Sequence, residues 1–251
     1  MAGDAGLPGI RAIERATLAA VPAPRLLFEG PFVVRTFLGG TGRANSACSL
    51  DPAEDPALPE RVARVEAFYA RFGRACRFRS TPLDPIGLGP LLLGRGYREV
   101  DESQVLCGPL AGFARADDAV TVLDGPDPEW MEVVGTAEHQ VPARRAEKLG
   151  MKDLLGMPAA WLLLHEGGVP AACAFATADG PLAGLFDLAV RPEFRRRGLG
   201  QRVMAAAGCW ARGMGAEFAY AQVSCANAAS LALNAGLGLR ERYRYRYLVR
   251  A

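Results

Sequence analysis

A basic segment with two glycines, close to residue 195, has the residue types that bind a phosphate group. The stretch from Leu185 to Gly200 reads Leu-Phe-Asp-Leu-Ala-Val-Arg-Pro-Glu-Phe-Arg-Arg-Arg-Gly-Leu-Gly. Its apolar first part predicts a buried strand, and a helix is expected from Leu199 onward. At such a junction, unpaired backbone N–H groups and the helix dipole favour an anion. The residues expected to bind it are Arg195, Arg196, Arg197, Gly198, Leu199 and Gly200.

The spacing Arg195-x-x-Gly198-x-Gly200 resembles the pyrophosphate loop of the GCN5-related N-acetyltransferase (GNAT) superfamily. The resemblance implies acetyl-CoA as co-substrate and transfer of its acetyl group to a primary amine of a small molecule or peptide, by direct attack in a ternary complex. The two glycines are expected to let the backbone approach the pyrophosphate. In the family, strand residues beside the loop hold the pantetheine arm, and a backbone N–H there polarises the thioester carbonyl. The positions carried over are Leu188, Ala189, Val190 and, after the next strand, Asn227. For Asn227, a helix N-cap is an equally sound interpretation.

Asp187 is our candidate general base, because a carboxylate on a buried strand is unusual. An ion pair with an arginine, or hydrogen bonds from the backbone, would explain it as well. Glu132, Glu138 and His139 are further candidates, since they lie on predicted helices that line the acceptor pocket in the family.

The acid that would protonate the departing thiolate is not evident. Many family members have a tyrosine four residues before a glycine, and here Ala232 stands four residues before Gly236. A thiolate is a good leaving group and can leave without a dedicated acid. The missing tyrosine also motivates an alternative function, a non-catalytic acyl-CoA-binding or sensing module. The hydroxyl or thiol groups that are candidates to replace it belong to Ser224, Cys225, Ser230, Tyr243, Tyr245 and Tyr247. The three tyrosines alternate with arginines and share one strand face, which also fits core packing.

The order of elements predicts an α/β protein with a mixed sheet and the GNAT fold in two tandem lobes. A strand, a short helix and a closing strand follow one another after residue 76 and again after residue 217. We expect a degenerate N-terminal lobe over residues 1–115, without a phosphate loop, and an acetyl-CoA-binding N-acetyltransferase domain over residues 116–251. The glycine-rich run from Gly39 to Arg43 precedes an extended segment, so it predicts a hairpin turn and not a phosphate site.

The composition argues against several classes of protein, namely those that bind nucleic acid, hold a metal ion or span a membrane. The 251 residues are 50% hydrophobic and carry a formal charge of only +2, which gives no case for nucleic acid binding. Six cysteines without a C-x-x-C pair, and only two histidines, argue against a metal site and indicate a reducing, cytoplasmic setting. Apolar runs do not reach the roughly 18 residues of a membrane span. Nothing in the sequence indicates the amine acceptor or the oligomeric state.

Overall fold

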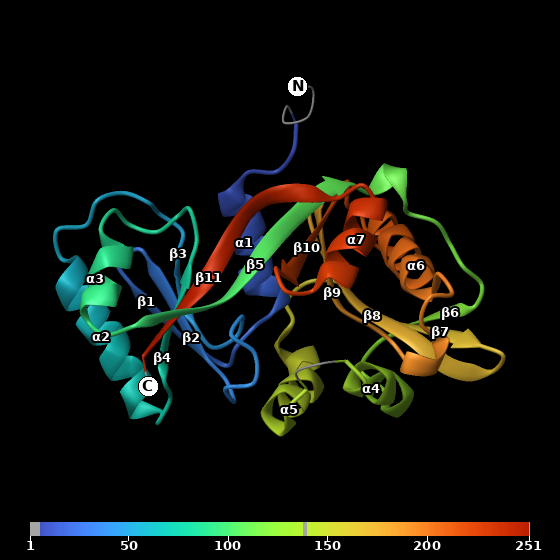
Figure 1. Cartoon of the computed structure of the whole chain (residues 1–251), viewed down its shortest axis with the longest axis horizontal. Coiled ribbons are helices and arrows are strands. Elements are labelled where there is room, and N and C mark those ends of the chain that lie inside the picture. Colours follow the sequence, from blue (N-terminus) through green and yellow to red (C-terminus); the bar gives the residue numbers. More distant parts are fainter. Residues whose placement is uncertain (1–5, 138–139, 251) are drawn as a thin grey trace.

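One mixed sheet runs through the whole protein (Figure 1). The structure is a computed structural model, and it describes residues 6–137 and 140–250. The strands of the N-terminal part are β1 (Arg25–Glu29), β2 (Phe32–Thr36), β3 (Ala47–Ser49), β4 (Cys76–Ser80) and β5 (Arg98–Pro109). Those of the C-terminal part are β6 (Val120–Leu123), β7 (Ala159–Glu166), β8 (Val169–Asp179), β9 (Leu182–Val190), β10 (Phe218–Ser224) and β11 (Arg240–Arg250). Their order across the sheet is β1-β2-β3-β4-β11-β5-β10-β9-β8-β7-β6.

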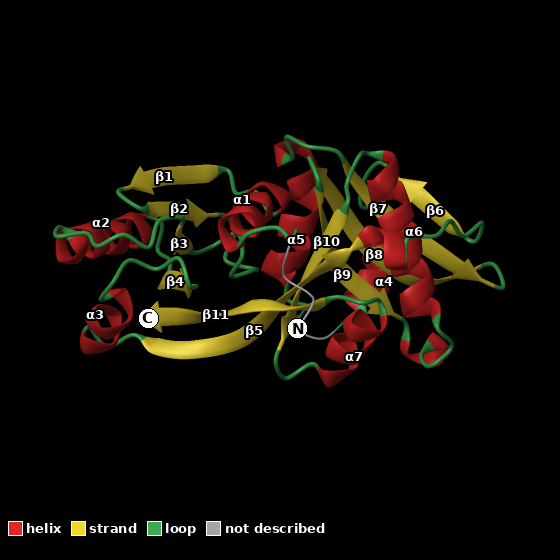
Figure 2. Ribbon diagram, turned by 90° about the horizontal axis from the view of Figure 1, so that it is seen from above, coloured by secondary structure: helices red, strands yellow, loops and turns green. Residues whose placement is uncertain are grey.

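Helices cover both faces of this sheet (Figure 2). They are α1 (Ile10–Ala20), α2 (Leu58–Arg71), α3 (Leu88–Gly94), α4 (Pro128–Gly135), α5 (Pro142–Met151), α6 (Leu199–Gly213) and α7 (Ala228–Gly236). Around β9, side chains of α6 build the core on one face, whereas those of α1, α4 and α5 build it on the other. A third core lies under α2 and α3. The two sides of β9 are therefore lined by different elements.

Most elements lie where the sequence predicts them, and the run from Gly39 to Arg43 does connect the antiparallel strands β2 and β3. The predicted helix that carries Glu132 is α4, which ends early, at Gly135. Thr136 follows it, and its Oγ1 donates to the Val133 carbonyl at 2.7 Å. A hydroxyl that bonds to the last turn competes with further helical hydrogen bonds, which explains the early end.

The two GNAT-like lobes exchange their closing strands. β5, from the first half of the chain, lies between β10 and β11. β11, from the second half, lies between β4 and β5 and pairs with both. The division into 1–115 and 116–251 remains a prediction, but backbone hydrogen bonds cross it in both directions. Residues 1–115 lack β11, which pairs with their strands β4 and β5, and residues 116–251 lack β5, which separates β10 from β11.

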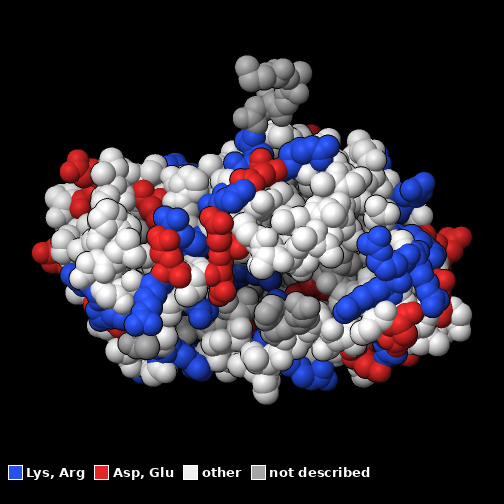
Figure 3. Space-filling view, viewed as in Figure 1, with Lys and Arg blue, Asp and Glu red and all other residues white. Residues whose placement is uncertain are grey.

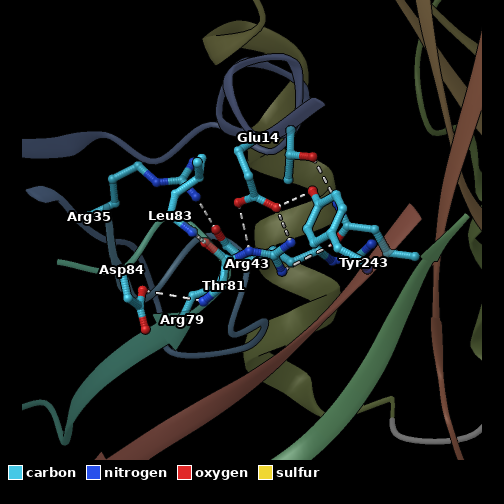
Figure 4. A network of polar contacts seen from close by, with 10 residues as sticks. Glu14, Arg35, Arg43, Arg79, Thr81, Leu83, Asp84 and Tyr243 are labelled. Carbon is cyan, nitrogen blue, oxygen red and sulfur yellow. Dashed lines mark hydrogen bonds and ion pairs between the residues drawn. The ribbon is translucent and has the colours of Figure 1, made fainter. Parts of the chain in front are cut away.

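A buried ion pair reinforces this junction (Figure 4). The Glu14 carboxylate on α1 accepts hydrogen bonds from Arg79 Nε at 3.0 Å and from Arg79 Nη2 at 2.7 Å, and both side chains are 1% exposed. The Tyr243 hydroxyl donates to the same carboxylate from β11. Tyr245 packs under the Arg79 guanidinium, 3.4 Å from its ring centroid. The tyrosines of β11 thus belong to the core between the lobes.

Candidate functional site

Strands β9 and β10 separate in the middle of the sheet. Their parallel pairing runs from Leu182 and Phe218 to Leu185 and Ala221 and stops there, although β9 continues to Val190 and β10 to Ser224. On its other side β9 stays paired with β8, where the Arg191 N–H donates to Ala171 at 2.9 Å. Because backbone groups alternate in direction along a strand, those of Val190 point toward the gap. An extended chain entering the gap would meet the Val190 N–H, whereas the Val190 carbonyl accepts a hydrogen bond from Arg195 Nε.

A β-bulge lies where this gap begins. The pairing of β8 with β9 shifts register between Cys173 and Phe175, and Asp187 opposite it has a left-handed φ of 51°. A bulge changes the face to which the next side chain points. As a result, the consecutive residues Phe186 and Asp187 both line one cavity. The sequence predicts the strand and the carboxylate, but it carries no signal for the bulge.

The phosphate loop ends in a left-handed residue that opens helix α6. Gly198 is the N-cap, with φ of 77°, and no side chain caps the helix. The first N–H groups of α6 therefore point out of the helix without intrahelical partners. An added Cβ on Gly198 would meet nothing within 4 Å, so this glycine is required for its backbone conformation. The predicted strand–loop–helix junction is confirmed.

The second glycine of the loop is also needed for packing. Gly200 is buried in the first turn of α6, and an ideal Cβ there would lie 2.8 Å from Leu233 Cδ1 on α7. Leu188 and Val190 of β9 lie on the same side. The glycine thus lets α6 pack closely on α7 and β9, and its approach to a phosphate stays a prediction.

The three arginines of the loop are exposed. Arg195 Nε donates to the Val190 carbonyl at 3.2 Å, which ties the loop to the end of β9. Arg197 donates to the Glu193 carbonyl at 3.1 Å and lies over the Phe194 ring. Figure 3 shows basic side chains gathered on the lobe that contains α6. The loop thus offers a pyrophosphate both free N–H groups and positive charge.

Asn227 forms the N-cap of α7, as one of the two interpretations predicts. Its Oδ1 accepts a hydrogen bond from the Ser230 N–H at 3.0 Å. The side chain is exposed, in the short connection between β10 and α7. Because the cap uses only Oδ1, the Nδ2 donor remains for a second partner.

Asp187 is held by cations. Lys148 Nζ forms an ion pair with its Oδ2, and Arg144 Nη2 lies 4.0 Å from its Oδ1. Burial alone would raise the pKa of Asp187, but the charges of Lys148 and Arg43 outweigh this effect and lower the pKa. Burial also lowers the pKa of Lys148. Asp187 therefore lies in an ion pair, as one of the interpretations predicts, but its nearest partner is a lysine and not an arginine.

The cavity beside Asp187 joins both halves of the chain. Its lining includes Phe37 and Arg43 from the loop after β2, Arg144 and Lys148 from α5, and Phe186 and Asp187 from β9. It lies on the α5 face of the sheet, opposite the phosphate loop. Sequence reasoning missed Arg43 and the basic residues of α5, because the only signal for them is a glycine-rich turn and an ordinary amphipathic helix.

Glu147 fixes the loop that carries Arg43. Its carboxylate accepts hydrogen bonds from the N–H groups of Leu38 at 3.0 Å, Gly40 at 2.9 Å and Thr41 at 2.7 Å. It also accepts one from Asn45 Nδ2 at 2.8 Å. A Cβ on Gly40 would collide with the backbone of Arg144. The turn predicted as a hairpin connection therefore also docks on α5 and forms a wall of the cavity.

Other candidates for proton transfer lie elsewhere or serve the structure. Glu132 is exposed and pairs with Arg191, and Ala232 is exposed on α7. Cys225 lies near Glu102, and both its partial burial and this carboxylate raise its pKa. Glu138 and His139 lie outside the described residues. Within 6–137 and 140–250, no helix is long and apolar enough to cross a membrane, and no group of three or more His, Cys, Asp or Glu side chains is placed to hold a metal ion.

The parted strand pair and the glycine loop that opens a helix agree with the expected GNAT fold, and comparison with known proteins identifies an acetyltransferase of the GNAT superfamily. The chain belongs to the family described as "Probable histone acetyltransferase Rv0428c C-terminal", whose model matches residues 8–248. Among curated proteins it is similar to the "Uncharacterized N-acetyltransferase YobR" of Bacillus subtilis (strain 168), with 28% identity over 236 residues, covering 89% of this chain and 92% of that protein.

Solved structures share the whole fold. A GCN5-related N-acetyltransferase from Kribbella flavida has a TM-score of 0.73 at 20% identity and covers 96% of this chain and 95% of its own. A tandem GNAT protein from the clavulanic acid biosynthesis pathway has a TM-score of 0.65 at 12% identity, with coverage of 95% and 87%. At these identities the likeness concerns the fold, and it agrees with the tandem arrangement expected from the sequence.

Proposed function

We propose that this acetyltransferase takes its acetyl group from acetyl-CoA and transfers it to a primary amine of a small molecule or peptide within a ternary complex. The observation that carries the proposal is the end of pairing at Leu185 and Ala221, which opens a gap beside the uncapped N-terminus of α6. The gap offers strand backbone to the two amides of pantetheine, and the helix terminus offers N–H groups to the pyrophosphate.

The residues proposed to hold the cofactor follow the gap in order. Leu188, Ala189 and Val190 supply the strand edge for the pantetheine arm. The N–H groups from Gly198 to Gly200 and the charges of Arg195, Arg196 and Arg197 face the phosphates, and the Asn227 amide approaches from α7. When bound, acetyl-CoA supplies a thioester, so that an amide bond forms as the carbon–sulfur bond breaks and one proton passes from nitrogen to sulfur by way of solvent. A free N–H near Val190 would stabilise the negative charge that develops on the carbonyl oxygen.

The acceptor is proposed to enter from the opposite face of the sheet, through the cavity at Asp187. Cofactor and acceptor then occupy different sides of β9 at the same time, as direct attack requires. A base works best when its pKa lies near the operating pH, and the pKa of Asp187 is lowered. We therefore assign to its carboxylate the binding and orientation of the amine, and leave removal of the proton to solvent.

The test is thiol release from acetyl-CoA across a panel of amines, together with thermal stabilisation by CoA. Gly198→Val should remove most of the CoA-dependent stabilisation, whereas Gly112→Val on the exposed turn after β5 should leave it intact. Asp187→Asn should lower turnover while CoA still binds. Unchanged CoA affinity in Gly198→Val would refute the loop assignment.

The alternative, a sensing module, rests on Ala232 in place of the usual tyrosine. It predicts stabilisation by acetyl-CoA with no thiol release on any amine.

A cytoplasmic setting is also part of the proposal. All six cysteines lie in the described part of the chain, and they are unpaired.

A further inference from the structure

The cavity at Asp187 holds more positive charge than its carboxylates neutralise. Arg43, Arg144 and Lys148 line it together with Asp187 and Glu147. Glu147 is already occupied by three backbone N–H groups and an amide, and Asp187 is paired with Lys148. Three cations thus face two carboxylates, which leaves one positive charge in excess, and within the residues that the structure describes neither guanidinium has a carboxylate of its own within hydrogen-bond distance.

These two arginines have unused hydrogen-bond donors. Among the described residues, the Arg43 guanidinium makes no hydrogen bond and contacts the Phe186 ring, at 5.4 Å from the centroid. Arg144 Nε is buried without a partner, and its Nη2 reaches Asp187 only at 4.0 Å. Arg43 and Arg144 line the same cavity, and burial and the charge of Arg43 both lower the pKa of Arg144. Such a pair is a binding site for an anion.

Negative and positive groups also alternate over a short distance here. Lys148 binds Oδ2 of Asp187, and the other oxygen, Oδ1, lies 4.0 Å from the Arg144 guanidinium, so an ammonium bound at Oδ1 would lie next to an anion bound at the arginines. A small zwitterion has its two charges at this spacing. A lysine side chain in a peptide has no anion beside its amine and would leave both guanidinium groups unpaired, which is costly in a partly buried site.

Resting on the proposed function, we infer that the acceptor is a small amine that carries a carboxylate close to its nitrogen, as a free amino acid does. Arg43 and Arg144 bind the carboxylate, and Asp187 binds the amine. The phenyl rings of Phe37, Phe175 and Phe186 line the same cavity and offer an apolar wall to the rest of the molecule. This gives the N-terminal lobe a function, because Arg43 lies on its loop and the contacts of that loop with Glu147 help to hold it at the cavity.

The experiment compares each of a set of free amino acids with its carboxamide, which keeps the amine and removes the negative charge. Thiol release should favour the free amino acid by about 10- to 100-fold in kcat/KM, the value of a charge-assisted Arg–carboxylate contact. Arg43→Gln and Arg144→Gln should each abolish most of this preference while stabilisation by CoA is retained. Arg212→Gln, at an exposed arginine in the last turn of α6, is the matched control and should keep it.

A binding measurement separates this inference from the proposed function. In the presence of CoA, an N-acetyl amino acid should stabilise the protein against heat more than its amide does, and Arg43→Gln should remove the difference. If carboxamides or a lysine-containing peptide react as well as every free amino acid, the inference is wrong although the proposed function stands. If no acceptor releases thiol, the proposed function fails. If the N-acetyl amino acid and its amide then also stabilise the protein equally, the inference is wrong too.

Discussion

Leu233 on α7 fills the space that a side chain at position 200 on α6 would occupy, with 2.8 Å between Leu233 Cδ1 and an ideal Cβ on Gly200. The two glycines of the phosphate loop therefore differ in their surroundings and in their backbone conformation. Gly198 has open space around it and a φ of 77°, whereas Gly200 has helical backbone and a crowded side.

Gly200→Ala should therefore destabilise the protein by about 1 kcal/mol, because overpacking against Leu233 Cδ1 exceeds the gain of about 1 kcal/mol in helix propensity. By itself, Leu233→Ala should lower the free energy of unfolding. In the double variant it makes room for the new methyl group at position 200, so this variant should be more stable than the sum of the two single changes predicts. Urea unfolding of the four proteins measures this coupling. Gly198→Ala should instead cost about 1–2 kcal/mol from left-handed backbone, with no rescue by Leu233→Ala. Additive effects of Gly200→Ala and Leu233→Ala would contradict the packing role.

The exchange of β5 and β11 predicts that the second lobe does not fold alone. A fragment of residues 116–251 lacks β5, which separates β10 from β11 in the sheet, and exposes both strand edges. We expect it to be aggregated or to lack a cooperative thermal transition, as measured by circular dichroism. Adding a separately produced fragment of residues 1–115 should restore a cooperative transition. A soluble 116–251 fragment that binds acetyl-CoA would show that the lobes are independent.

Sequence patterns predict the local parts of this structure and miss those that depend on distant contacts. The strand ending at Val190, the loop and helix α6 are adjacent in the chain, so their order is visible in residue types alone. The bulge at Asp187 and its contact with Lys148 depend on the register of β8 and on the docking of α5. The reason for Gly200 is a leucine 33 positions away. For the same reason, nothing around Gly39–Arg43 indicates that this turn would reach a site on the other lobe.

Glu147→Gln tests the docking of that turn. The amide keeps one acceptor oxygen but presents an NH₂ group to some of the four donors that now bind the carboxylate. Buried donors that lose a charged acceptor cost about 1.5–3 kcal/mol each, so we expect a loss of about 2–4 kcal/mol in the free energy of unfolding. Hydrogen exchange should increase in residues 38–45 above all. Glu54→Gln, at an exposed glutamate before α2, should change neither measurement, and a similar effect of both changes would exclude a specific role for Glu147.

Asp84 makes the stability of the N-terminal lobe depend on pH. Burial raises the pKa of this carboxyl from 3.8 to about 6, although Ser80 Oγ and the Thr81 N–H both donate to it. The folded protein therefore binds this proton more tightly than the unfolded chain. Its stabilising contribution is complete below pH 4 and is lost as the pH rises through about 6. The difference between the two pKa values corresponds to at most about 3 kcal/mol.

Asp84→Asn removes this titration and keeps an oxygen that can accept from Thr81. The melting temperature of the variant, relative to the unchanged protein, should therefore rise between pH 4 and pH 7.5 in thermal scans at constant ionic strength. Asp118→Asn, at an exposed position, is the matched control, and its relative melting temperature should stay constant. A relative melting temperature of Asp84→Asn that falls over this range would mean that the folded state prefers the charged carboxylate, since only then would the aspartate stabilise the fold at neutral pH.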